Sequence, residues 1–155
     1  MKIKMMMGAL VVVFASAMVC SAQPSAHMGT WKLNEAKSKF SKGAPKNHTV
    51  VYEAAGDMTK VTVDGVDGSG AATHNEWTGK FDGKYYAVTG SATGDMRSYA
   101  RVNSRTLRFH EKKDGNVVLN GTITVSRNGK SRTVTTTSKN AAGKWMTNVA
   151  VYDKQ

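Results

Sequence analysis

Few side chains of this 155-residue sequence are suited to acid–base, metal or nucleophilic chemistry, and their spacing matches no catalytic motif. None of the four histidines forms a His-x-His pair, a spacing suited to one metal ion. They stand at His27, His48, His74 and His110. There is no Gly-x-Ser-x-Gly nucleophile motif, and the one cysteine is Cys20. We therefore expect no catalytic site, metal or cofactor, although an enzyme on a ligand-binding scaffold stays as a third hypothesis.

Carboxylates and aromatic residues follow a structural pattern instead. Five acids adjoin turn signals, where Asp is explained by local backbone hydrogen bonding. They are Asp57, Asp64, Asp67, Asp82 and Asp114. Seven aromatic residues lie in predicted strands, namely Trp77, Tyr85, Tyr86, Tyr99, Phe109, Trp145 and Tyr152. Such side chains either surround a ligand cavity or pack a core, and packing is the favoured interpretation for any single one.

The elements that must position these residues are strands. Short runs rich in Val, Thr and Tyr alternate apolar and polar residues, as in 60–64 and 106–110, and Gly-centred turn signals such as Asp114-Gly115 separate them. The regular spacing predicts an all-β, antiparallel up-and-down barrel in preference to a sandwich. We expect ten strands, at about 29–34, 48–54, 58–64, 70–78, 84–90, 95–102, 105–112, 116–125, 131–138 and 144–153. One short helix is expected over 34–40, because Asn34 is an N-cap candidate before good helix formers.

The N-terminal segment has the three parts of a secretory signal. Lys2 and Lys4 precede an uncharged apolar run from Met5 to Val19, and small residues then permit cleavage after Ala22. This predicts a signal peptide over 1–22, a barrel domain over 23–155, a periplasmic or secreted location, and no membrane span after processing. An uncleaved anchor and a lipidated Cys20 are less favoured alternatives.

The formal net charge is +11, and without Lys2 and Lys4 there remain 20 Lys and Arg against 11 Asp and Glu. Such a charge suits acidic partners. Because no run of five like charges occurs, we expect an evenly basic, solvated surface without a basic tail. The expected export argues against a nucleic-acid partner. The oligomeric state is left open.

Both ends of the predicted barrel resemble calycin proteins. Gly29-Thr30-Trp31-Lys32-Leu33 is similar to the Gly-x-Trp opening of lipocalins, and Val149 to Lys154 resembles the last strand of intracellular fatty-acid-binding proteins. The opening is most similar to that of exported bacterial lipocalin-like proteins of unassigned function. The resemblance implies that Trp31 plugs the closed end of the barrel and that Tyr152 points inward.

The resemblance also implies where a ligand would lie. Fatty-acid binders place an arginine two residues before the terminal tyrosine, but Ala150 stands here. Alternation from Tyr152 puts Met146, Asn148 and Ala150 inward with it. We therefore expect an exported barrel that binds an apolar or neutral amphiphilic molecule, through Tyr152, Asn148, Met146, Tyr99, Arg101 and Trp77. The alternative is a filled barrel that acts on the cell envelope through its basic outer surface.

Overall fold

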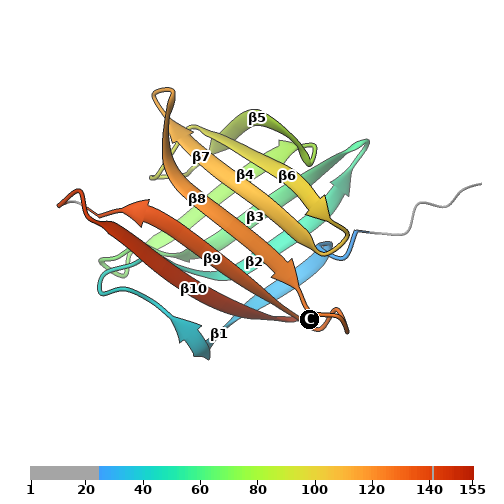
Figure 1. Ribbon diagram of the computed structural model, residues 1–155, viewed down its shortest axis with the longest axis horizontal. Helices are drawn as coiled ribbons and strands as arrows, with labels where there is room; N and C mark the ends of the chain where they lie inside the picture. Colours follow the sequence, from blue (N-terminus) through green and yellow to red (C-terminus); the bar gives the residue numbers. More distant parts are fainter. Residues whose placement is uncertain (1–24, 141) are drawn as a thin grey trace, which may run out of the picture.

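The computed structural model describes residues 25–140 and 142–155, so the expected signal peptide lies outside the described residues. The described residues form ten antiparallel strands and no helix. Each strand pairs with its neighbours in the chain, and β1 pairs with β10 to close the wall (Figure 1). The predicted ten-stranded antiparallel barrel is confirmed. The strands are β1 Gly29–Lys39, β2 Lys46–Ala55, β3 Met58–Val66, β4 Ala72–Gly79, β5 Asp82–Thr89, β6 Met96–Asn103, β7 Thr106–Lys113, β8 Asn116–Val125, β9 Ser131–Lys139 and β10 Trp145–Lys154.

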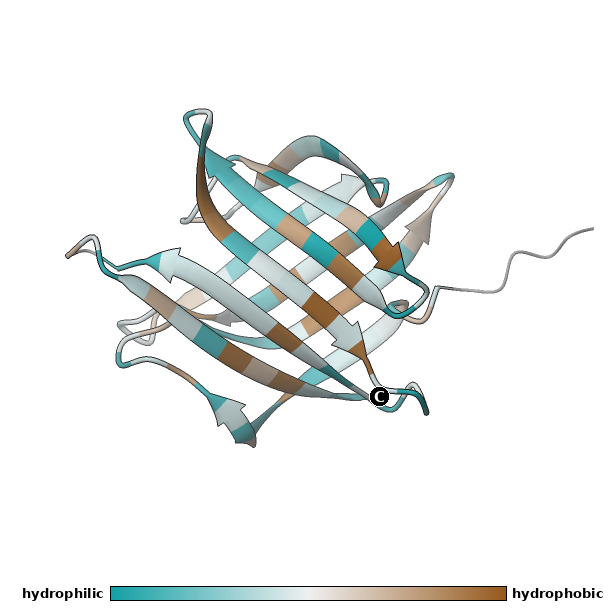
Figure 2. Ribbon diagram, viewed as in Figure 1, coloured by the Kyte–Doolittle hydropathy of each residue, from teal (hydrophilic) through white to brown (hydrophobic). Residues whose placement is uncertain are grey.

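The alternating pattern of the sequence decides which side chains face the interior. Val61 and Val63 of β3 are buried, as are Leu107 and Phe109 of β7. Figure 2 shows the result as brown bands that alternate with paler or teal ones along the strands. Burial of these apolar side chains is the main favourable contribution to folding of the barrel.

Two turn signals had different outcomes. Asp114-Gly115 forms the two-residue turn between β7 and β8, with φ of 50° and 78°, as expected for this pair. Asp64-Gly65, in contrast, continues strand β3. A Cβ atom at Gly65 would overlap the backbone carbonyl of Lys46. Glycine is required there by the close approach of β2.

The predicted helix over 34–40 is wrong, because β1 continues to Lys39. Asn34 pairs with Val151 but Lys39 pairs with Val149, so β1 bulges outward between them. The capping chemistry itself is present, since the Lys37 N–H donates to Asn34 Oδ1 at 3.2 Å. The Val151 N–H then donates to Ser38 Oγ at 2.9 Å. A two-turn helix is marginal alone, and pairing with β10 closes the barrel instead.

The two ends of the barrel differ. At one end the segment before β1 covers the interior, where His27 and Trp31 are completely buried. We call this the closed end. The connections β1–β2, β3–β4 and β5–β6 lie at the other end and border an internal cavity. No helix among the described residues is long and apolar enough to cross a membrane.

Candidate ligand cavity

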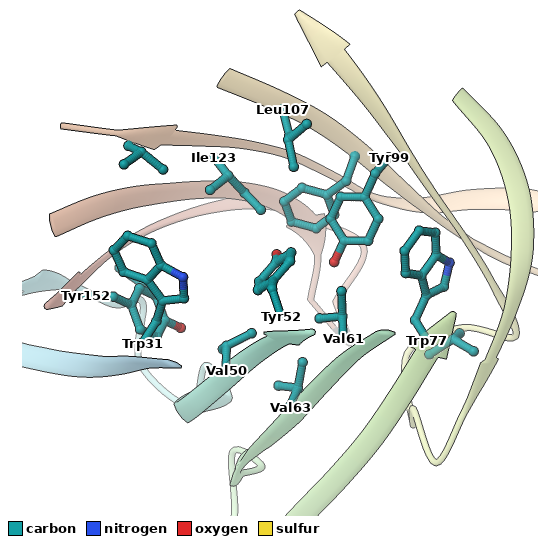
Figure 3. Close-up of a cluster of buried hydrophobic side chains, with 14 residues drawn as sticks. Trp31, Val50, Tyr52, Val61, Val63, Trp77, Tyr99, Leu107, Ile123 and Tyr152 are labelled. Atoms are coloured by element: carbon teal, nitrogen blue, oxygen red, sulfur yellow. The ribbon is translucent and has the colours of Figure 1, made fainter. Parts of the chain in front are cut away.

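The barrel encloses a cavity of about 410 Å³ that opens away from the closed end. Apolar and polar side chains both line its walls, and the apolar ones include Val63, Phe109 and Ile123. Figure 3 shows Val63 and Ile123 projecting into the barrel from opposite walls, with Tyr52 between them. Phe40 and Pro45 of the β1–β2 connection lie at the rim. The cavity therefore has walls of mixed polarity and is bordered by connecting segments.

Three of the predicted site residues lie on this cavity. Tyr152 and Asn148 line it from β10, and Tyr99 lines it from β6. All three lie on the inner face, as the alternation of side chains along a strand predicts. Asn148 also accepts a hydrogen bond from the Ser41 N–H at 2.7 Å. That bond holds the β1–β2 connection against β10 at the rim.

The other three predicted site residues are not among those that line the cavity. Met146 is half-buried near the start of β10. Arg101 is exposed, and its guanidinium carbon lies 5.9 Å from the centre of the Phe81 ring. Trp77 is buried, and its indole N–H donates to the backbone carbonyl of Arg97 at 2.9 Å. The structure therefore places Trp77 in the packed core.

Trp31 lies where the barrel plug was predicted. It is completely buried, and its indole N–H donates to the backbone carbonyl of His27 at 2.9 Å. The bond ties the covering segment to the first strand. Figure 3 shows Trp31 beside Tyr152 within the barrel.

The sequence reasoning missed Arg132, which lines the floor of the cavity and is only 2% exposed. Its guanidinium carbon lies 4.8–4.9 Å from the ring centres of Trp31, Tyr52 and Tyr152. Its Nε and Nη1 have no hydrogen-bond partner among the described residues. Since a guanidinium stays charged in proteins, the floor carries a positive charge held by three aromatic rings. Alternation along β9 from Val134, had it been applied, would have placed Arg132 inward.

A second missed arginine, Arg97, is buried on β6, and its charge is neutralised. It contacts Glu111 Oε2 at 3.4 Å and donates to Asn75 Oδ1 at 3.2 Å. The other Glu111 oxygen accepts a hydrogen bond from Ser91 Oγ at 2.6 Å. This pair ties the β5–β6 connection to the cavity wall, and its two charges balance each other.

Two buried phenols that line the cavity, those of Tyr152 and Tyr99, stay protonated. Burial raises the pKa of Tyr152 to about 12, although the positive charge of Arg132 acts to lower it. Burial also raises the pKa of Tyr99. These hydroxyl groups are therefore neutral hydrogen-bond donors at physiological pH. Together with Arg132 they offer donors to a hydrogen-bond acceptor.

Comparison with known proteins places the fold only. The structure of EF1p2_mFAP2b bound to DFHBI matches with a TM-score of 0.50 and 11% identity, over 84% of this chain and 94% of that one. A redesigned beta barrel, b11L5F_LGL, matches with a TM-score of 0.44 and 10% identity, over 84% and 93%. No protein-family model matches the chain, and no curated protein matches it significantly. The likeness to EF1p2_mFAP2b extends to the β-barrel fold alone.

Proposed function

We propose that this protein is an exported binding protein, without catalytic activity, that holds one small amphiphilic molecule inside its barrel. The observation that carries the proposal is the cavity of about 410 Å³, which has apolar side chains among its walls and an unpaired charge at its floor. Ligand pockets start at roughly 300 Å³, whereas the filled-barrel alternative requires no such space. The DFHBI held by a barrel of similar fold is consistent with this use. Export is supported by the secretory pattern of residues 1–22.

The chemistry of the floor changes the expected ligand. The prediction of a neutral ligand rested on the absence of a charged side chain from the inner face of the last strand. Ala150 stands there in the position where fatty-acid-binding proteins have an arginine. Arg132 of β9 pairs with Tyr152 across the β9–β10 ladder, so the neighbouring strand supplies a guanidinium beside this tyrosine. A buried, uncompensated charge is costly. A ligand with a carboxylate or a similar anionic group would offset that cost, while its apolar part packs against the walls.

Equilibrium titration tests this proposal with decanoate and with decanol, which share a chain length and differ in charge. We expect wild-type protein to bind decanoate at least about tenfold more tightly, the affinity equivalent of a charge-assisted hydrogen bond. Arg132→Met should remove this preference. Arg108→Met, which removes an arginine on the outer side of β7, is the matched control and should keep it. Failure of both compounds to bind wild-type protein would reject the proposal for ligands of this class.

A further inference from the structure

The basic residues are not distributed evenly, contrary to the expectation from the sequence. Residues 25–95 carry eight lysines and eight acids, whereas residues 96–154 carry twelve Lys and Arg against three acids. All six arginines of the chain lie between Arg97 and Arg132. Because the strands follow chain order around the barrel, β6–β10 form one continuous half of the wall (Figure 1). The charge excess is therefore confined to that side, and we call its outer surface and turns the basic half.

Ion pairs increase the contrast between the two halves. Four of the eight lysines in residues 25–95 belong to ion pairs, for example Lys46 with Glu35 at 2.6 Å and Lys60 with Glu76 at 2.8 Å. In the basic half, none of the eight accessible cations belongs to an ion pair among the described residues. They are Arg105, Arg108, Lys112, Lys113, Arg127, Lys130, Lys139 and Lys144. Their charges are available to an external anion.

Several of these cations gather at the closed end. Val125 N–H donates to the Arg105 carbonyl at 2.9 Å, which places the β6–β7 turn beside the end of β8. Lys154 N–H donates to the Lys130 carbonyl at 2.8 Å, so the β8–β9 turn lies beside the C-terminus. Figure 2 shows this turn as a hydrophilic projection next to the C-terminus. Arg127 belongs to the same turn. We call Arg105, Arg127, Lys130 and Lys154, which lie on these neighbouring segments, the basic rim.

A polar groove with a volume of about 340 Å³ lies on the outer side of β7–β9. It separates the basic rim from the lysines at the open end, which are Lys112, Lys113, Lys139 and Lys144. Hydroxyl, amide, imidazole and guanidinium groups line it, and they come from Arg108, His110, Asn120, Thr122, Thr135 and Thr137. His110 Nδ1 lies 2.7 Å from Asn120 Oδ1. Such groups can bond both to the hydroxyls and to the carboxylates of a sugar chain.

We propose that the basic half binds a linear acidic polysaccharide along its outer surface. Unpaired cations at both ends of the strands suit a ligand with repeated negative charges, and the groove between them suits sugar hydroxyls. The polar lining of the groove contains no Trp, Tyr or Phe that would stack on the bases of a single-stranded nucleic acid. The large exposed apolar residues Val102, Val117 and Trp145 are on three different strands, which disfavours docking to a membrane.

The test uses polygalacturonate, a linear polymer with one carboxylate per sugar, and its methyl-esterified form as the neutral comparison. Binding of the mature protein is measured by biolayer interferometry at several salt concentrations. The variant Arg105→Gln/Arg127→Gln/Lys130→Gln removes three cations of the basic rim. Lys39→Gln/Lys42→Gln/Lys84→Gln removes three exposed lysines from the β1–β5 half, so both variants change the net charge equally. Thermal melts establish that both variants fold.

We expect wild-type protein to bind polygalacturonate and not the esterified polymer, with affinity that falls as salt rises. The rim variant should lose about tenfold or more in affinity and show a shallower salt dependence. The control should stay within about twofold of wild type. Equal losses in both variants, no binding by wild type, or tighter binding to phosphatidylglycerol vesicles or a single-stranded oligonucleotide would each overturn the proposal. Decanoate binding should be the same in all three proteins, which separates this surface from the cavity.

Discussion

Arg132 and Tyr152 face each other across the β9–β10 ladder, and the guanidinium carbon of Arg132 lies 4.9 Å from the centre of the Tyr152 ring. Trp31 and Tyr52 complete a cage around the same guanidinium. Aromatic faces attract a cation but accept hydrogen bonds poorly, so the cage compensates for only part of the lost hydration. The unpaired N–H groups of Arg132 therefore favour a ligand group that accepts hydrogen bonds at the cavity floor.

A trade-off between stability and binding should follow at Arg132. Replacing a buried, incompletely paired charge with an apolar side chain of similar length is often neutral or stabilising. We therefore expect Arg132→Met to have a free energy of unfolding equal to or above that of wild type in urea melts, while its preference for decanoate is lost. A loss of more than about 2 kcal/mol would exceed the worth of a typical cation–π contact. Such a loss would show that Arg132 mainly stabilises the fold.

Trp31 should be far more important for stability. Truncation of a buried Trp to Ala typically costs about 3–5 kcal/mol, and Trp31 is completely buried beneath the cavity. Urea melts should show this loss for Trp31→Ala. Trp31→Phe is the matched variant, which keeps an aromatic ring at this position but lacks the indole N–H that bonds to the His27 carbonyl. It should lose much less, and a Trp31→Ala protein as stable as wild type would contradict the plug assignment.

Gly121 should be intolerant of a side chain. It lies within β8, and a Cβ atom there would overlap the ring of Phe109, which is buried and lines the cavity. Overpacking of this kind typically costs about 1–3 kcal/mol, so Gly121→Ala should unfold at lower urea and bind decanoate more weakly. Thr122→Ala changes the exposed neighbour and should be close to neutral. Equal stability of the two variants would show that Phe109 has room to move.

His27 should make the stability depend on pH. Burial, followed by the charges of Arg132, Arg101 and Lys154, lowers the pKa of His27 from 6.5 to about 4. The unfolded chain therefore takes up a proton at a higher pH than the folded protein does. The stabilisation is complete above pH 6.5 and is lost as pH falls toward 4, by about 3 kcal/mol in total.

Urea melts across this range check the dependence on His27, with His27→Gln as the comparison. The difference in unfolding free energy between the two proteins should shrink by that amount between pH 6.5 and 4. A difference that stays constant would mean that the folded protein accommodates a charged imidazole. The exposed His74, whose pKa is raised by its hydrogen bond to Asp64, is present in both proteins and cancels.

The sequence allowed the ten strands to be predicted because alternation and turn residues are local signals. Predicted and observed bounds of β8 are identical, and Asp114-Gly115 formed the expected turn. The helix over 34–40 failed because its capping residue serves a bulge that only the pairing of β1 with β10 produces. Local propensity contains no information about that long-range pairing.

The site was less predictable than the fold, for two physical reasons. The ligand contacts predicted on the last strand came from its inner face and are all uncharged, whereas Arg132 reaches the same place from the neighbouring strand. Arg101 shares an inner-facing register with Tyr99, yet its distance from the open end puts it outside the cavity lining. Alternation fixes which side of the wall a side chain takes, but depth along the barrel also decides whether it meets a ligand.

Native mass spectrometry of the protein purified without denaturation from its native source tests the central claim, a small molecule inside the barrel, most directly. We expect a mass excess of one small molecule over the polypeptide, released on collisional activation. Thr136→Trp, which fills the cavity from β9, should lack the excess, while Thr135→Trp, its outward-facing neighbour, should keep it. Bare polypeptide in every sample, with no adduct after addition of decanoate or decanol, would contradict the account.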